Sequence, residues 1–202
     1  DNPDIIISYS GGKDSLVMLD IISSLTKKTI NILYMDMGLQ LEVDDANLKY
    51  ALNYDVKIHT TIHWNVLNYL REGIFCFPNK SIQQISYNDI CFMYMQELNC
   101  KYIFNGSKSC DSAFKKLQLG QQGNKVDGIL FPLKDWNKYE IMAYIKTKNI
   151  PLPEQDRTES KYNTSGIDLT KSSLLWLYQK HYDDFCRLES LFPFIRTQIK
   201  RE

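Results

Sequence analysis

The sequence predicts an α/β protein built on a doubly wound, mainly parallel five-stranded sheet with a C-terminal helical extension. Short β-type runs alternate with helical patterns along most of the chain, which is typical of a parallel sheet covered by helices. Pro151, Pro153 and a polar stretch then interrupt this alternation before the last helical patterns. With 202 residues the chain is long enough for one substantial core.

Each expected strand is a short run rich in β-branched and aromatic residues. The first contains Ile5-Ile6-Ile7, and the five runs cover residues 4–9, 30–35, 56–62, 101–105 and 128–132. Helical patterns cover residues 14–25, 43–53, 65–72, 83–98 and 137–148, with one or two more between 171 and 200. We therefore expect a main domain at 1–153, and a linker with a helical extension at 154–202.

Composition indicates an ordinary globular protein. Hydrophobic residues make up 44% and charged residues 24%, and the 24 basic and 24 acidic side chains cancel. A nucleic-acid partner is possible but is not indicated, since no global field would attract a polyanion. No run approaches the about 18 apolar residues of a membrane span, so no membrane association is expected. Asp1 in place of Met is consistent with a fragment or a processed product.

The cysteines favour a reducing compartment, and we expect the cytoplasm. The five cysteines form no CxxC pair and no spacing typical of zinc or iron–sulfur ligands, so no cluster is expected. Their odd number without a signal peptide points the same way. We expect Cys186 to be a partly buried structural thiol. Cys110 is better placed for chemistry, because Lys108 would lower its pKa.

The most informative segment is a phosphate-binding loop between the first strand and the first helix, formed by Ser10, Gly11, Gly12, Lys13, Asp14 and Ser15. Adjacent glycines let backbone N–H groups approach an anion, and a helix start adds unpaired N–H groups with a positive dipole end. Lys13 adds a charge and the serines add hydroxyls. This is not the GxxxxGK[ST] loop, because Ile7 and Asp14 occupy positions that it reserves for Gly and Ser or Thr.

Two further segments fall at strand ends, where ligands bind in open α/β sheets. After the second strand, Asp36 is placed to face a nucleotide and Gly38 permits close approach, although Asp36 could also simply cap the strand end. After the fourth strand, a glycine followed by hydroxyls and cations could contact ribose or phosphate. The nucleotide-binding candidates at these two ends are Met35, Asp36, Gly38, Gly106, Ser107, Lys108 and Asp111.

The histidines do not predict a metal site. His59 and His63 have i,i+4 spacing, but they lie in or just past a β-type run, so a strand-edge or surface role is favoured over ligation. For His181 we expect packing or capping.

The motifs in order resemble a known family. SGGKDS resembles the pyrophosphate loop of the PP-loop superfamily, the adenine-nucleotide alpha hydrolases. The series DMG, NGSKSCDSAFKK, FPLKDW and IPLP, in this order and spacing, is similar to the phosphoadenosine phosphosulfate (PAPS) reductase domain family over about residues 4–153. The resemblance implies an adenine nucleotide as ligand. In FPLKDW we expect Trp136 to pack the following helix on the sheet and Pro132 to shape the loop before it.

The chain departs from the family pattern in two ways. The ECGxH-type tail with its reactive cysteine is replaced by FIRTQIKRE, and the arginine pair after the fourth strand is replaced by Lys108 and Cys110. Lysine does not bind phosphate bidentately, which favours ATP over PAPS. Lys13, Asp14 and Asp36 are then the candidate catalytic residues, with Asp14 and Asp36 as candidate Mg²⁺ ligands.

Three hypotheses stay open. In the first, the enzyme activates an unidentified substrate by adenylyl transfer with release of pyrophosphate, as a transferase and possibly for sulfur transfer. In the second, it reduces a sulfonucleotide through an atypical cysteine. In the third, it is a non-catalytic nucleotide-binding subunit whose 165–202 segment docks on a protein partner or a second copy. The segment would then expose Leu174, Leu175, Trp176, Leu177, Tyr178, Phe185, Leu191 and Phe192, although folding against the sheet is favoured.

Overall fold

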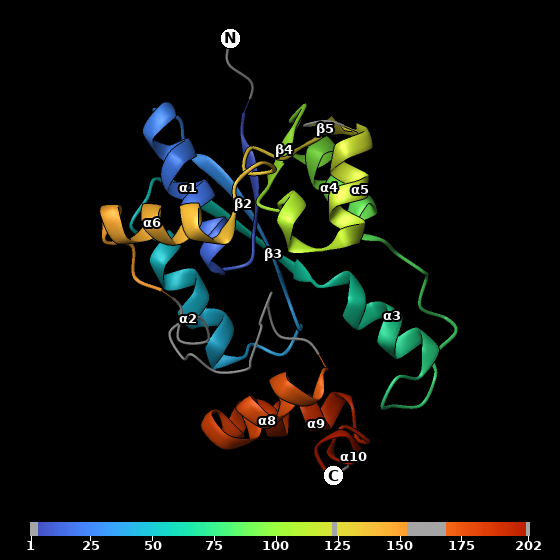
Figure 1. Ribbon diagram of the computed structural model, residues 1–202. Coiled ribbons are helices and arrows are strands. Elements are labelled where there is room, and N and C mark those ends of the chain that lie inside the picture. Colours follow the sequence, from blue (N-terminus) through green and yellow to red (C-terminus); the bar gives the residue numbers. More distant parts are fainter. Residues whose placement is uncertain (1–3, 123–124, 153–168, 201–202) are drawn as a thin grey trace.

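The computed structural model describes residues 4–122, 125–152 and 169–200, and their centre is a parallel sheet (Figure 1). The strands are β1 (Ile6–Tyr9), β2 (Ile30–Asp36), β3 (Val56–Ile62), β4 (Ile103–Asn105) and β6 (Ile129–Leu130), with β5 (Lys125–Val126) added at one edge. Their order is β3-β2-β1-β4-β6-β5. All pairs are parallel except β5 with β6. The expected five parallel strands are therefore confirmed, and the short antiparallel β5 is an addition.

Helices connect the strands as the alternating pattern predicts. They are α1 (Lys13–Leu25), α2 (Glu42–Ala51), α3 (Trp64–Glu72), α4 (Tyr87–Glu97), α5 (Ala113–Gln122) and α6 (Lys138–Lys148), with a 3-10 turn η1 (Ser109–Asp111) before α5. Helix α5 was not predicted. Its sequence AFKKLQLGQQ has no clear apolar period, and within residues 113–120 Leu119 is the buried side chain.

The two faces of the sheet bury different helices, because successive side chains of a strand point to opposite sides. Ile7 of β1 belongs to a cluster with residues of α1, α2 and α6, whereas its neighbour Ile6 packs with residues of α4 and α5. Both isoleucines are fully buried. The sheet is therefore covered on both sides, as expected for a doubly wound fold.

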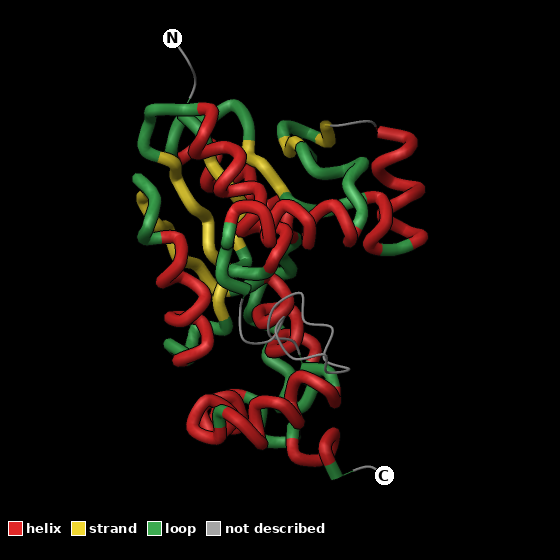
Figure 2. The backbone as a smooth tube through the Cα atoms, turned by 60° about the vertical axis from the view of Figure 1, so that its left-hand side comes forward, coloured by secondary structure: helices red, strands yellow, loops and turns green. Residues whose placement is uncertain are grey.

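A third cluster joins the C-terminal helices to the rest of the protein. Helices α8 (Lys171–Lys180), α9 (Tyr182–Leu191) and α10 (Arg196–Ile199) lie together at the end of the molecule away from the N-terminus (Figures 1 and 2). Their apolar side chains pack on the segment after β2 and on the region of α3, as Met37, Leu41, Val43 and Val66 belong to the same cluster.

The helical extension is thus confirmed, but its apolar face is mostly covered from within the chain. Leu174, Trp176, Leu177, Phe185 and Phe192 are buried, Leu175 and Leu191 are half-buried, and Tyr178 is exposed. They pack beyond the end of β2 and not on the sheet itself. The expected boundary at 153/154 and residues 165–168 of the expected docking segment lie outside the described residues.

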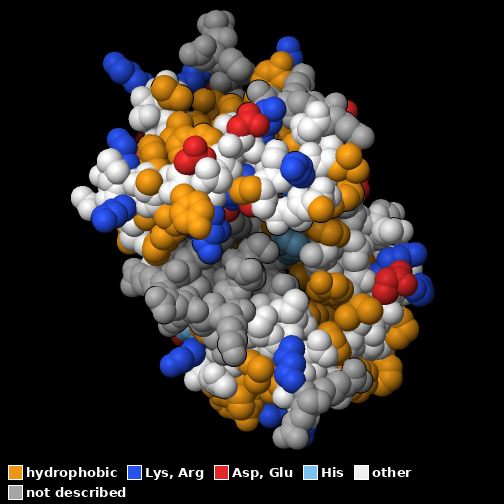
Figure 3. All heavy atoms as spheres, in the orientation of Figure 1, with side chains coloured by type: hydrophobic (Ala, Val, Ile, Leu, Met, Phe, Trp, Pro, Cys, Tyr) orange, Lys and Arg blue, Asp and Glu red, His pale blue; other side chains and the backbone are white. Residues whose placement is uncertain are grey.

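Two surface properties can be compared with the sequence-based expectations. Among the described residues no helix combines the length and apolar composition that a span requires. Lys and Arg side chains are scattered over the face seen in Figure 3, in keeping with the balanced charge of the chain.

Candidate functional site

The glycine-serine loop lies where the strand order reverses. Strands β2 and β3 lie on one side of β1, and β4 and β6 on the other, so the loop between β1 and α1 occupies the switch point of the sheet. Gly11 has φ of +73°, a conformation that favours glycine. Helix α1 begins after Gly12 with no side-chain cap. Turn, helix start and switch point therefore coincide, as an anion site requires.

The two serines hold the loop in shape. The Ser15 hydroxyl donates to the carbonyl of Gly12 at 2.8 Å, and the N–H of Gly12 donates to Ser10 Oγ at 3.4 Å. The two hydroxyl oxygens are 3.4 Å apart. The predicted contacts of these hydroxyls with phosphate stay predictions, but the loop is already closed on itself by its own side chains.

A buried lysine joins the loop to the segment after β4. Lys108 Nζ lies 2.6 Å from Asp14 Oδ2 and 2.9 Å from Asp111 Oδ1, and the side chain is 2% exposed. Burial works against the charge of Lys108, but the hydrogen bonds and charges of both aspartates prevail and raise its pKa. A contact between Lys108 and a phosphate would require the ammonium to leave these carboxylates, so this assignment stays a prediction, as does that of Asp111.

The two carboxylate oxygens of Asp14 differ in their partners. Its Oδ2 lies within 3.3 Å of Lys13 Nζ as well as near Lys108, while Oδ1 is buried without a hydrogen-bond partner among the described residues. The described part of the chain holds no group of three or more His, Cys, Asp or Glu side chains arranged for a metal. Mg²⁺ commonly takes only one or two carboxylates and completes its shell with phosphates and water, so Asp14 fits the predicted role.

The segment after β4 packs tightly on the loop. A Cβ on Gly106 would lie 3.4 Å from the carbonyl carbon of Asp14, at the edge of ordinary van der Waals contact, so the two backbones approach each other closely here. Asn105 accepts the N–H of Ser107 at 2.8 Å and donates to the Tyr87 hydroxyl at 2.6 Å. Gly106 and Ser107 therefore lie beside the phosphate loop, as the sequence predicts for strand ends.

Asp36 ends β2 next to the loop, since β1 and β2 are paired in parallel. Asp36 Oδ1 accepts the N–H of Gly38 at 2.6 Å, and Gly38 has φ of +72°. Burial raises the pKa of Asp36, and the bond from Gly38 partly offsets this. The local turn accounts for one oxygen of Asp36, and its predicted nucleotide and Mg²⁺ roles stay predictions. Met35 is half-buried and packs against the cluster that contains Ile6.

Sequence reasoning missed a buried carboxylate in the first turn of α2. Asp44 is 7% exposed, accepts the Tyr34 hydroxyl at 2.7 Å through Oδ1, and keeps Oδ2 without a hydrogen bond. Burial raises the pKa of Asp44 to about 6, and the charges of Asp36, Asp184 and Asp45 add to this against the bond from Tyr34. The sequence signal is weak, because an acidic first turn is ordinary in helices.

The cysteines separate into buried and exposed groups. Cys76, Cys91 and Cys100 are buried, and burial raises the pKa of Cys91 to about 11. Cys110 is exposed in η1 with Sγ 3.3 Å from the carbonyl of Trp136. Cys186 is also exposed, so the expectation of a partly buried thiol was wrong. An amphipathic helix leaves positions on its outer face, and α9 turns Cys186 outward.

The histidines have structural partners. His59 lies in the edge strand β3 with Nε2 3.0 Å from Asn31 Oδ1, and His63 accepts the N–H of Asn65 as the cap of α3. The ring of His181 lies 4.6 Å from that of Trp176, between α8 and α9. The strand-edge role of His59 and the packing role of His181 are therefore confirmed, whereas the cap that His63 provides for α3 was not predicted.

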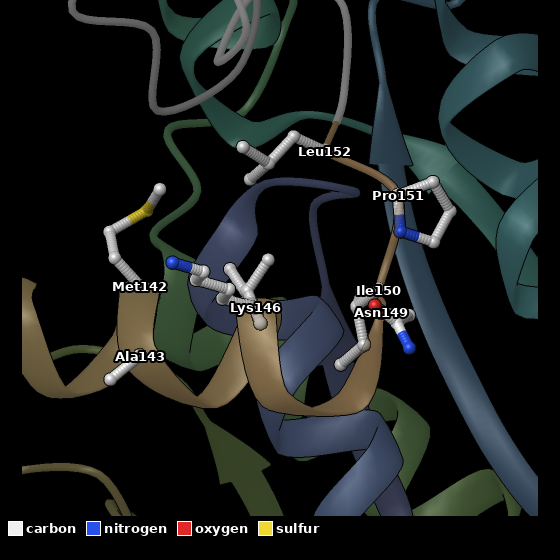
Figure 4. Close-up of a pocket in the computed structure, with 8 residues that line it drawn as sticks. Met142, Ala143, Lys146, Asn149, Ile150, Pro151 and Leu152 are labelled. Carbon is white, nitrogen blue, oxygen red and sulfur yellow. The ribbon is translucent and has the colours of Figure 1, made fainter.

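The FPLKDW segment supports both α6 and η1. Trp136 packs edge-on against Tyr144 of α6 at 5.9 Å, as predicted. The N–H of Ser109 donates to the carbonyl of Lys134 at 2.8 Å, which ties this segment to the turn holding Lys108. A groove of about 700 Å³ runs along the end of α6 (Figure 4), and its lining includes Met142, Lys146, Pro151 and Leu152.

Fold and loop together define the class of protein. A doubly wound parallel sheet with a Ser-Gly-Gly loop opening the first helix at the switch point is an α/β fold of the PP-loop type. Within this class, the chain belongs to the family defined by the phosphoadenosine phosphosulfate reductase domain, which matches residues 4–155.

Individual relatives agree with this class. The tRNA(Ile)-lysidine synthase of Orientia tsutsugamushi (strain Boryong) is 25% identical over 195 residues, and the match spans 87% of this chain but 43% of that protein. The U34-tRNA thiolase NcsA from Methanococcus maripaludis, solved with its [4Fe-4S] cluster, aligns with a TM-score of 0.58 at 16% identity, over 100% of this chain and 74% of that one. The NH3-dependent NAD synthetase from Campylobacter jejuni subsp. jejuni NCTC 11168 aligns with a TM-score of 0.54 at 14% identity, over 99% of this chain and 86% of that one. These two structures share the fold.

Proposed function

We propose that the protein binds ATP at residues 10–15 and transfers its adenylyl group to a substrate, releasing pyrophosphate. The observation that carries this proposal is the position of the loop: Gly11 turns the backbone at the switch point of the sheet, and α1 begins directly after it without a side-chain cap. Backbone N–H groups, a helix start and Lys13 then meet at one place, which suits a pyrophosphate group.

The chemistry follows from this placement. A nucleophilic atom of the acceptor forms a bond to the α phosphorus, the bond from that phosphorus to the bridging oxygen breaks, and the electron pair leaves with pyrophosphate. Lys13 and the loop N–H groups would stabilise the charge that develops on the leaving group. Mg²⁺, when bound, would neutralise phosphate charge, and Asp14 and Asp36 are the residues that would hold it. The buried Asp14 Oδ1 supports this role.

ATP is preferred over a sulfonucleotide because the cations beside the loop suit it better. Lys108 stands where the family pattern has arginine, and two carboxylates already surround its ammonium. A 3′-phosphate would therefore lack the bidentate partner that arginine supplies. Reduction of a sulfonucleotide through Cys110, with thioredoxin supplying the two electrons, is the second candidate, since that exposed thiol lies in the turn bonded to the FPLKDW segment.

The acceptor of the adenylyl group belongs to one of two chemical classes. The relative that matches 87% of this chain is a tRNA(Ile)-lysidine synthase, which makes a base in tRNA one acceptor to test. Small sulfur and nitrogen nucleophiles are the other class, in keeping with a sulfur-transfer role. We propose the cytoplasm as the place of action.

Nucleotide binding provides the first test. Calorimetry with ATP, AMP and PAPS should give the tightest binding for ATP with Mg²⁺, and Lys13→Ala should weaken ATP binding about tenfold or more while affecting AMP less. Lys28→Ala is the matched control, because Lys28 pairs with Asp4 on the surface. Tighter binding of PAPS than of ATP would reverse the nucleotide assignment.

Product analysis then separates the reactions. Incubation with ATP, Mg²⁺ and either a tRNA pool or small thiol and amine acceptors should release AMP or an adenylylated product together with pyrophosphate. Sulfite release from PAPS that disappears in Cys110→Ser would instead establish the reductase alternative. Nucleotide binding with no turnover under either condition would favour a non-catalytic subunit.

A further inference from the structure

The segment between β2 and α2 is held by residues that lie more than a hundred positions away in the sequence. We call residues 37–41 the β2–α2 loop. It follows Asp36, contains Gly38 and leads into α2. Asp184 and Arg187 of α9 both bond to this region, so the loop that contains Gly38 and follows Asp36 is bound to the C-terminal helices.

Asp184 caps α2 from outside that helix. The residue at the N-cap of α2, Leu41, has no side chain that can accept a hydrogen bond. Instead, Asp184 Oδ1 accepts the N–H of Glu42 at 2.9 Å and Oδ2 accepts the N–H of Val43 at 3.1 Å. Asp184 is 1% exposed. A buried carboxylate at a helix N-terminus gains both these bonds and the favourable dipole, so it fixes where α2 begins.

Arg187 bonds to the loop just before the residues that Asp184 caps. Its Nη1 donates to the carbonyl of Gln40 at 2.7 Å and lies 3.2 Å from Asp184 Oδ1. Gln40 has φ of +50°, a conformation that non-glycine residues adopt only at a cost. The bond from Arg187 helps to keep Gln40 there, and Arg187 also compensates the buried charge of Asp184.

Apolar contacts complete the attachment. Met37, Leu41 and Val43 are buried in one cluster with Phe185 and Leu188 of α9. The loop is therefore fixed by its backbone and by its side chains to the same helix. At its other end, Gly38 is bonded to Asp36. Only residues 37–41 separate Asp36 from α2, so a shift of α9 that moves this loop would also displace Asp36.

We infer that Asp184 and Arg187 are positioning residues of the nucleotide site, acting through the β2–α2 loop on Asp36 and Gly38. This inference rests on the proposed function for what the loop contacts. The match to the family domain ends at residue 155, so both proposed positioning residues lie outside the matched residues.

The test compares four variants, Asp184→Ala, Asp184→Asn, Asp183→Asn and Glu189→Gln, in the full chain. Asp184→Ala removes the cap, and Asp183→Asn is the matched control, because Asp183 precedes it in α9 but is exposed. Glu189→Gln breaks the ion pair with Arg196 within the C-terminal helices and controls for their stability. The measurements are the dissociation constant of ATP with Mg²⁺, the melting temperature and hydrogen exchange at residues 37–43.

We expect Asp184→Ala to weaken ATP binding about tenfold and to speed exchange at residues 37–43, because a displaced loop misplaces Asp36. Asp184→Asn, which keeps one acceptor, should recover part of the affinity. Glu189→Gln should lower the melting temperature with unchanged ATP affinity, and Asp183→Asn should change neither.

Equal ATP affinity in Asp184→Ala and Glu189→Gln would overturn the inference and leave Asp184 a structural residue only. If the unmodified protein binds no ATP, the proposed function fails, and hydrogen exchange alone decides whether the loop is positioned by α9. Faster exchange at 37–43 in Asp184→Ala only would support that positioning, and equal exchange in both variants would reject it.

Discussion

At the residue scale, the partners of a charged side chain decide what it can do. Lys108 follows a glycine and a serine at a strand end, which suggests a phosphate ligand, yet its ammonium lies between Asp14 and Asp111. Buried charges are stable when paired, and the pairing joins the phosphate loop to η1. The main role of Lys108 is therefore structural: it holds the phosphate loop and η1 together.

Lys108→Met should lower the free energy of unfolding by about 2 kcal/mol, because Asp14 and Asp111 lose their common partner but remain partly in contact with water. Urea unfolding of this variant beside Lys116→Met, an exposed lysine of α5, measures the difference. An unchanged unfolding midpoint together with lost ATP affinity would assign Lys108 to the nucleotide instead.

At the element scale, one helix is capped by a neighbouring residue in the sequence and another by a residue from a distant helix. Helix α6 carries its own cap: Asn137 accepts the N–H groups of Tyr139 and Glu140, and Glu140 accepts the N–H of Asn137. Asn137 and Glu140 are three residues apart, so this cap is formed by neighbouring residues alone, although the sequence analysis did not predict it. Helix α2 has no such residue and depends on Asp184, which sequence analysis missed because the two lie 142 residues apart.

Asn137→Ala should therefore lower stability by about 1 kcal/mol, because the N–H groups of Tyr139 and Glu140 lose their acceptor. The denaturant midpoint measures this, with Gln179→Ala on the exposed side of α8 as the control. A midpoint equal to that of the control would mean that water replaces this cap at no cost.

At the scale of the whole molecule, α2, β2 and α9 meet around one buried carboxyl group. Asp44 of α2 is bonded by Tyr34 of β2 and lies near the charges of Asp36 and Asp184. Because these surroundings raise the pKa of Asp44 to about 6, the folded state binds its proton more tightly than the unfolded state does.

This group makes the protein less stable as pH rises. Between the unfolded pKa of about 4 and the folded value of about 6, the contribution of Asp44 to stability falls, by about 2 to 3 kcal/mol in all. Asp44→Asn should remove that part of the pH dependence and be the more stable form at pH above about 6. Unfolding free energies from pH 4.5 to 7.5 measure the effect, and Asp45→Asn, an exposed neighbour, should keep the original slope. Parallel curves for Asp44→Asn and the unmodified protein would contradict this assignment.

The sequence by itself determined the features that depend on neighbouring residues: the alternation that builds a parallel sheet, the glycine turn before α1, and the helical pattern of α6. Local backbone preferences and periodicity suffice for these. Only the tertiary structure decided that Lys108 joins two aspartates, that α9 caps α2, and that the apolar C-terminal helices cover the end of β2. Each of those contacts joins segments far apart in the chain, and burial selects the partner only once the elements have come together.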